Sequence, residues 1–172
     1  MISTDRLTLR KLIQSDSDDV YKIYSDVETC RYLLHEPWTD QSKVELFEIE
    51  FIKDDFGSEN GMNFAVVLND TVIGVLSAWR TEMKKTAEIG FSFNKNYSGY
   101  GYATEAAMAL LNHLFEDKNM HRVIANYDAR NTASARLCER IGMRKEAHFI
   151  KDFWNKEEWT DSYIFAVLKK EF

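Results

Sequence analysis

The segment NYSGYGYAT, residues 96–104, holds the residues whose types and spacing most directly suggest a binding site. Gly99 and Gly101 lie between an alternating apolar run and an alanine-rich amphipathic stretch, where a strand is expected to turn into a helix. The backbone N–H groups of such a turn, with the unpaired N–H groups of a first helical turn, form a pocket for an anion. Glycine also lets a phosphate approach the main chain closely. Because glycine is the usual residue of tight turns, a turn without any ligand is the alternative.

Two common phosphate loops do not match this corner. A P-loop requires Gly-Lys followed by Ser or Thr, and the chain contains no such run. A dinucleotide fingerprint requires glycine or alanine three positions after Gly101, where Thr104 stands. That fingerprint also requires a parallel sheet, whereas the strands before this corner are predicted to be antiparallel. A phosphate site at this corner would therefore belong to another class.

Hydrophobic periodicity predicts a mixed α+β fold around the corner. Alternating patterns indicate strands at residues 4–13, 62–68, 72–81, 85–93, 121–128, 143–152 and 157–170. Helical spacing indicates helices at residues 15–27, 39–56, 103–117 and 131–141, the second of them ending near Gly57. One β-α-β unit is thus embedded in a mostly antiparallel sheet. With no linker, repeat or low-complexity tract, the chain is expected to form a single domain, residues 1–172.

The composition argues against several classes of protein. The net charge is -6, whereas a nucleic-acid-binding surface would normally be basic. No uncharged stretch approaches the roughly 20 residues of a membrane helix, and charges interrupt the first apolar run, which argues against a signal peptide. The two cysteines, Cys30 and Cys138, are isolated, and the histidines show no metal-ligand spacing. We therefore expect a cytoplasmic protein with reduced thiols and no metal, nucleic acid or membrane partner.

Two blocks together resemble the GNAT superfamily of N-acetyltransferases with high specificity. Residues 88–105, EIGFSFNKNYSGYGYATE, resemble its strand-loop-helix signature, in which a Gln/Arg-x-x-Gly-x-Gly/Ala loop holds the pyrophosphate of coenzyme A. Ser98 departs from the Gln/Arg of that pattern, whereas Gly101 and Ala103 fit it. Residues 131–143, NTASARLCERIGM, resemble the family's Asn-x-x-Ser/Ala-x-x-Leu-x-Glu-Lys-Leu-Gly-Phe block. The start, TDRLTLRKL, and the run GYATEA resemble the branch that contains the ribosomal-protein (alanine) N-acetyltransferases.

The resemblance implies a GNAT-like fold and acetyl-CoA as the cofactor. The fold would be a mostly antiparallel central sheet with helices on both faces, splayed between its fourth and fifth strands, here 85–93 and 121–128. The pantetheine arm would enter this splay and bond to the main chain of the fourth strand. The implied cofactor-binding residues are Phe91, Phe93, Ser98, Gly99, Tyr100, Gly101, Tyr102, Ala103, Thr104, Asn131 and Ser134. A buried strand equally explains the two phenylalanine side chains, and a helix N-cap equally explains Asn131.

The resemblance also assigns chemical roles. Acetyl transfer requires a neutral amine, a stabilised carbonyl oxygen and a protonated leaving thiolate. Glu88 is the candidate general base, acting through water, with a solvated strand glutamate as the alternative. Gly90, in the middle of a strand, indicates a bulge or a close backbone approach, with a simple kink as the alternative; a bulge would free an N–H for the thioester carbonyl. Ser134 is the candidate proton donor because its helical face points toward the sheet, although a first-turn serine also favours capping. Many members of the family use a tyrosine where Cys138 stands here.

The first helices and the loop between them shape the acceptor site in this family. The candidate wall is therefore RYLLHEPW, residues 31–38, where Glu36 and Trp38 would receive a cationic amine, unless Trp38 belongs to the core. We expect direct transfer in a ternary complex to a primary amine, first of all the N-terminus of a ribosomal protein. A polyamine or aminoglycoside is the alternative acceptor, and a silent acyl-CoA-binding module is the alternative function. The resemblance implies a monomer or a homodimer.

Overall fold

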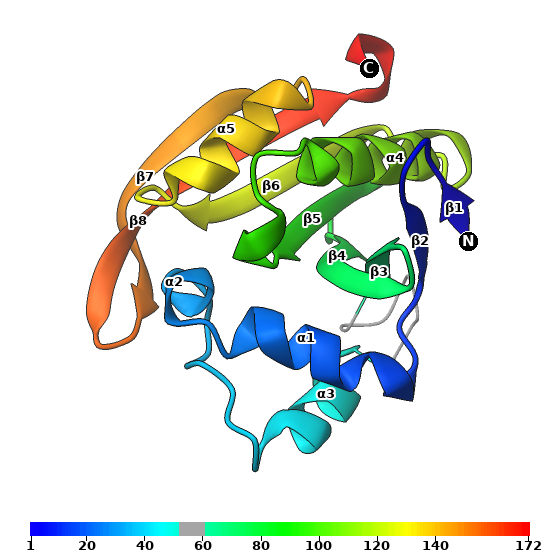
Figure 1. The fold of residues 1–172 in the computed structure, drawn as a ribbon. Coiled ribbons are helices and arrows are strands. Elements are labelled where there is room, and N and C mark those ends of the chain that lie inside the picture. The colour runs from blue at the N-terminus through cyan, green and yellow to red at the C-terminus, as the bar shows by residue number, and fades with distance from the viewer. Residues whose placement is uncertain (52–60) are drawn as a thin grey trace.

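The computed structural model describes residues 1–51 and 61–172, and its framework is an eight-stranded sheet (Figure 1). The strands lie in the order β1-β2-β3-β4-β5-β6-β8-β7. Among the described strands, only β5 and β6 pair in parallel, and the chain between them passes through a helix. The mixed fold with one embedded β-α-β unit is therefore confirmed. The strands are β1 Ile2–Ser3, β2 Thr8–Lys11, β3 Met62–Leu68, β4 Thr71–Arg80, β5 Thr86–Phe93, β6 Arg122–Asp128, β7 Arg144–Asn155 and β8 Glu158–Leu168.

Helices cover both faces of the sheet, as expected (Figure 1). One face carries α1, α2 and α3, and the other carries α4 and α5 (Figure 1). None of the described helices has the length and apolarity needed to cross a membrane. The helices are α1 Ser17–Tyr24, α2 Val27–Cys30, α3 Lys43–Phe51, α4 Tyr102–Glu116 and α5 Thr132–Arg140.

Each face has its own hydrophobic core. Val20 and Ile23 of α1 are fully buried in a cluster that includes Val75 of β4. On the opposite face, Leu110 and Leu114 of α4 are fully buried against the central strands. These side chains recur at three- and four-residue spacing, which places one stripe of each helix on the sheet. The two cores hold the central strands in a rigid layer on which the site is built.

The sheet splits where β5 and β6 separate. These strands pair only from Thr86–Arg122 to Glu88–Ile124. Beyond that point β5 continues along β4, while β6 continues along β8. Among the described residues, the edge of β5 that faces β6 has no paired strand over residues 89–93, so backbone N–H and C=O groups on this edge can bond to something else. The splay expected between these two strands is confirmed.

The N-terminal part of the chain differs most from the sequence-based expectation. The predicted strand 4–13 is shortened to β2, Thr8–Lys11, because the Thr4 side chain and backbone bond to Leu7 and turn the chain between β1 and β2. The predicted helix 15–27 ends at Tyr24, and Asp26 then caps the separate helix α2 by accepting a hydrogen bond from the Thr29 N–H. For the predicted helix 39–56, the structure shows α3 from Lys43 to Phe51. The rest of that prediction, including Ile52 and the end near Gly57, lies outside the described residues.

Candidate active site

The glycine corner forms the start of α4 and a hollow beside it. Gly99 and Gly101 have φ values of 87° and 81°, in the left-handed region that favours glycine, and Gly101 is the N-cap of α4. Unpaired N–H groups of the first turn of α4 make this place suitable for an anion. Tyr100 is 64% exposed and points away from the hollow. The hollow has a volume of about 410 Å³ and is lined by Phe93, Tyr97, Ser98, Gly99, Gly101, Tyr102, Ala103, Thr104 and Arg140.

Two arginines hold this corner in place. The Arg6 guanidinium donates from Nη1 to the Tyr100 carbonyl at 2.9 Å and from Nε to the Glu105 carboxylate at 2.7 Å. Arg140 reaches from α5 and donates from Nε to the Thr104 hydroxyl at 3.1 Å. A guanidinium at the rim strengthens the attraction that the start of a helix exerts on an anion. The two arginines therefore fix the position of the corner and add positive charge to it.

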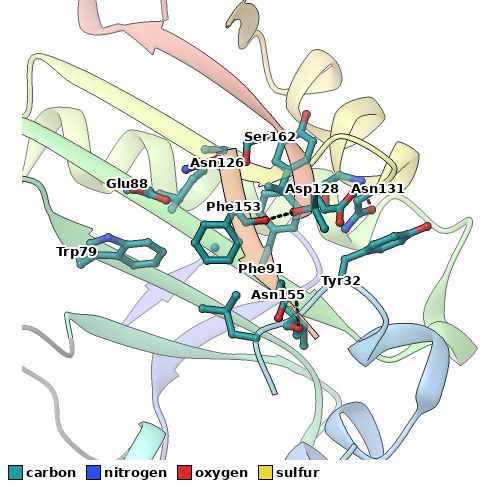
Figure 2. A pocket seen from close by; sticks show the side chains of 18 residues that line it. Tyr32, Trp79, Glu88, Phe91, Asn126, Asp128, Asn131, Phe153, Asn155 and Ser162 are labelled. Atoms are coloured by element: carbon teal, nitrogen blue, oxygen red, sulfur yellow. Dashed lines mark hydrogen bonds between the residues drawn. The ribbon is translucent and has the colours of Figure 1, made fainter. Parts of the chain in front are cut away.

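A second pocket, of about 340 Å³, lies where β5 and β6 separate (Figure 2). It brings together five residues that the sequence singled out separately, namely Glu88, Gly90, Phe91, Asn131 and Ser134. Glu88 approaches from β5 and Ser134 from α5, so the pocket is lined by groups from the sheet and from the helix layer. Phe93 lines the hollow at the corner instead. The free edge of β5 thus runs from one cavity to the other.

Glu88 is a half-buried carboxyl group inside this pocket. It lies directly across from Trp79 on β4, and both side chains line the cavity (Figure 2). Removal from water raises the pKa of Glu88 from 4.5 to about 7, because burial disfavours the charged form. No charged or hydrogen-bonding neighbour among the described residues contributes to this change. Near neutral pH the carboxylate and the carboxylic acid are therefore both populated, which suits a group that exchanges protons.

Gly90 lies in a regular part of β5, so the predicted bulge is wrong. Gly90 pairs with Ser77 in an unbroken register between β4 and β5. A Cβ atom at this position would lie 3.5 Å from Cζ3 of the Trp79 indole, which is an ordinary van der Waals contact, so this ring does not by itself require a glycine. Gly90 lines the pocket, and a larger side chain there would reduce the space beside Glu88.

Asn131 and Ser134 stand at the start of α5. The Asn131 side chain accepts a hydrogen bond from the Ser134 backbone N–H at 3.1 Å, which makes Asn131 the N-cap. This cap uses the backbone of Ser134 and leaves its hydroxyl available to the pocket. Farther along α5, Cys138 is fully buried, and burial raises the pKa of its thiol to about 12. Cys138 therefore stays protonated at neutral pH, beside the Tyr127 hydroxyl, which is itself buried without a well-formed hydrogen bond among the described residues.

The predicted acceptor wall is only partly in place. Tyr32, Leu33 and Leu34 of the candidate segment line the pocket. Trp38 does not, because it is 3% exposed in the α1/α3 core and stacks on Tyr24 with ring centroids 5.1 Å apart. Glu36 is also absent from the lining, and its side chain is 77% exposed near Lys156. The predicted wall is thus formed by the residues just before Glu36 in the sequence, and Glu36 and Trp38 take no part in it. The opposite wall is made by Phe153, Asn155, Thr160 and Ser162 of β7 and β8.

Comparison with known proteins identifies this architecture. A sequence model of the acetyltransferase (GNAT) domain matches residues 6–144. The chain belongs to the GNAT family of acetyltransferases. The uncharacterised N-acetyltransferase YnaD of Bacillus subtilis (strain 168) is 35% identical over 172 residues, covering 99% of this chain and 98% of YnaD. The crystal structure of a GNAT-family acetyltransferase from Bacillus anthracis superposes with a TM-score of 0.88 at 32% identity, covering 99% of each chain.

A shorter match concerns the ribosomal-protein branch. The ribosomal protein uS5-alanine N-acetyltransferase of Escherichia coli (strain K12) is 30% identical over 80 residues, covering 46% of this chain and 41% of that enzyme. The family assignment makes this protein a GNAT N-acetyltransferase, while a match over less than half of either chain leaves its acceptor open.

The sequence-based prediction did not include several residues of this GNAT pocket. Trp79 faces Glu88 from a neighbouring strand, and only the strand register reveals that they are partners. Phe153 and Asn155 lie near the tip of the β7–β8 hairpin. The alternating pattern predicts these two strands but does not predict what their tip contacts. Arg140 stands in the second family block, but its approach to Thr104 depends on how α5 packs beside α4. Among the described residues, no cluster of His, Cys, Asp and Glu could hold a metal ion.

Proposed function

We propose that this GNAT N-acetyltransferase transfers the acetyl group of acetyl-CoA to a primary amine in the pocket between β5, β6 and α5. The observation that carries the proposal is that Glu88 and Ser134 line one pocket at the point where the paired strands separate. A group titrating near neutral pH and a hydroxyl group thus border the same small space. Acetyl-CoA supplies the acetyl group as an activated thioester.

The residues that would hold acetyl-CoA fit its chemistry. The pyrophosphate is anionic, and the hollow at Gly99 and Gly101 offers helix N–H groups and the Arg140 guanidinium. The pantetheine arm contains amide groups, and the free edge of β5 at residues 89–93 offers backbone partners for them. Phe91 and Phe93 lie on that edge, one in each cavity, which supports the expected path from the phosphates to the reacting atoms. Tyr100 faces solvent and is expected to contribute its backbone only.

Glu88 on β5 and Ser134 on α5 have separate roles in the proposed reaction. Glu88, in its carboxylate form, takes a proton from the ammonium form of the acceptor, directly or through water, so that the amine nitrogen gains its lone pair. As the amine nitrogen bonds to the acetyl carbonyl carbon and the carbon–sulfur bond breaks, Ser134 would pass its hydroxyl proton to the sulfur. It would regain a proton, through water, from the nitrogen, which loses one as it becomes an amide. Cys138 is less suited to this step, because its side chain is fully buried. Backbone N–H groups of the free β5 edge stabilise the carbonyl oxygen as it gains charge.

Two acceptor classes fit this chemistry, a protein N-terminus and a small-molecule amine. The partial match to the ribosomal-protein enzyme supports the first class. The enclosure of the pocket by two separate segments supports the second. Either class delivers a primary amine to Glu88, so the chemical roles do not depend on the choice.

The proposal is tested by measuring binding and turnover on the same protein. Calorimetry with acetyl-CoA is expected to show binding, and a thiol-release assay with a panel of peptides and small amines is expected to show coenzyme A production that depends on the amine. Glu88→Gln should abolish most of the turnover and retain the binding. Glu82→Gln, the same change at an exposed glutamate in the turn before β5, is the matched control and should retain both. Tight binding without turnover of any amine would instead favour a silent acyl-CoA-binding module.

A further inference from the structure

The pocket beside Glu88 is closed over by two segments that are far apart in the sequence. The Lys156 ammonium, at the turn between β7 and β8, donates to the Cys30 carbonyl oxygen at 2.8 Å. The Asn155 side-chain amide donates to the Leu33 carbonyl oxygen at 3.3 Å (Figure 2). These two bonds join the tip of the β7–β8 hairpin to residues 30–34, at the end of α2 and directly after it. We call this junction the roof.

A third tie reinforces the roof from the side. The Arg130 guanidinium lies over the Tyr32 ring, 5.8 Å from its centroid. The same guanidinium donates to both carboxylate oxygens of Asp128, at 2.9 and 2.7 Å, and to Glu158 on β8. Cation–π contacts and ion pairs of this kind are individually weak at an exposed site, but together they limit how far the two segments can separate.

The space below the roof is small and its walls are mainly apolar. Trp79, Phe91, Phe153, Tyr32 and Leu33 provide rings and an aliphatic side chain around Glu88. The volume of about 340 Å³ lies at the lower end of the range for small-molecule pockets. A protein N-terminus would have to enter as an extended strand of several residues, each spanning roughly 3.3–3.6 Å, beside a wall in which Leu33 and Asn155 are tied together.

The charges of the pocket restrict the acceptor further. Among the described residues that line it, the carboxyl groups are those of Glu88 and Asp128. Asp128 is already paired with Arg130, so only Glu88 is available to an incoming ammonium group. A polyamine or an aminoglycoside carries several ammonium groups and would leave all but one without a counter-charge inside an apolar space, which is costly.

We propose that the acceptor is a small primary amine with one amino group and an apolar, preferably aromatic, body. Its amino group lies at Glu88, and its body lies between the Trp79 and Phe153 rings under the roof. This inference rests on the acetyl transfer proposed above and adds the class of acceptor to it. In this proposal the roof acts as a size filter that favours small amines over polypeptide ends.

A competition among three acceptors tests this proposal. 2-Phenylethylamine, spermidine and a tetrapeptide with a free N-terminus are each assayed for kcat/KM with saturating acetyl-CoA. We expect 2-phenylethylamine to exceed the other two by about tenfold or more, since filling or leaving empty an apolar subsite changes discrimination by about 10- to 200-fold. Phe153→Ala should raise KM for 2-phenylethylamine by a similar factor and should change KM for ethylamine, which lacks the ring, much less.

The roof is tested with a double variant and a matched control. Asn155→Ala combined with Lys156→Ala removes both bonds to residues 30–34 and should raise kcat/KM for the tetrapeptide relative to 2-phenylethylamine. Lys151→Ala removes an exposed lysine from the same hairpin and should leave this ratio unchanged. A parent enzyme that prefers the tetrapeptide or spermidine would overturn the acceptor class but leave acetyl transfer intact. A parent enzyme that binds acetyl-CoA and acetylates no amine would overturn both.

Discussion

Replacing Glu88 with glutamine removes an ionisable group from the pocket while keeping its size. Burial raises the pKa of Glu88 from 4.5 to about 7, so the folded protein holds a proton on this group that the unfolded chain has already lost in that pH range. The stability contributed by that proton is complete below pH 4.5 and is lost as the pH rises through about 7. Above pH 7 the folded protein therefore carries the full cost of a buried carboxylate, and glutamine relieves it.

The size of this effect follows from the pKa difference. The change from 4.5 to about 7 corresponds to about 3 kcal/mol at 1.36 kcal/mol per pH unit. Glu88 is only half-buried, and solvent screening reduces the expected gain for Glu88→Gln to about 1 kcal/mol at pH 8. At pH 4.5 the variant and the parent should have nearly equal free energies of unfolding. Urea unfolding at both pH values measures the difference, with Glu82→Gln as the control that should show none.

The same variant has a kinetic signature. For the parent, log kcat/KM should rise with a slope of one below pH 7, because Glu88 must be in its carboxylate form, and should level off above pH 7, because the acceptor then still arrives as the ammonium ion that Glu88 deprotonates. Glu88→Gln should show a slope of one throughout and a loss of about 100-fold or more at pH 7. A variant with the parent's slopes would refute the role of Glu88 as the base. Equal stability of variant and parent at pH 8 would refute the burial argument for its pKa.

Three further changes test the rest of the site. Ala103→Glu places a carboxylate in the first turn of α4, where it favours the helix but repels a pyrophosphate, so acetyl-CoA affinity by calorimetry should fall about tenfold with no loss of thermal stability. An unchanged affinity would exclude the corner as the phosphate site. Arg140→Gln should weaken binding severalfold and make it less sensitive to salt, whereas Arg136→Gln on the exposed side of α5 should not. Ser134→Ala should lower turnover by about 100-fold or more at nearly constant acetyl-CoA affinity, because the helix cap uses the Ser134 backbone and survives. Cys138→Ala should cost some stability and little turnover, and the opposite ranking of these two variants would make Cys138 the proton donor.

The parts of this fold that sequence reasoning predicted are those governed by local rules. The turn at Asn69 and Asp70 has φ values of 46° and 62°, as expected for a two-residue hairpin loop of this composition. Gly99 and Gly101 both adopt left-handed backbone conformations, which explains why a chain with seven glycines places two of them at one strand-to-helix corner. Each of these features depends on residues a few positions apart, so the sequence carries the whole signal.

The parts that were missed depend on contacts between distant segments. Lys156 bonds to the Cys30 carbonyl across 126 positions, and no pattern in either segment predicts that the two segments meet. Trp38 is an aromatic residue in the expected acceptor segment, yet it lies in the α1/α3 core, where it stacks on Tyr24 and contacts the tilted ring of Phe51. Gly90 suggested a bulge, whereas it pairs in regular register with Ser77 on the neighbouring strand. Long-range packing therefore decides the acceptor side of the site, while local pattern decides the cofactor side.

Acetyl transfer itself is tested most directly by following the label from cofactor to product. The protein is incubated with acetyl-CoA carrying an isotopic label in the acetyl group and with 2-phenylethylamine, spermidine and a tetrapeptide together, and the products are measured by mass spectrometry. Acetyl transfer predicts the label on an amine nitrogen, with one coenzyme A released for each acetylated amine and both products lost in Glu88→Gln. Acetyl-CoA that binds at the Gly101 corner and is recovered intact, with no labelled amine, would contradict it.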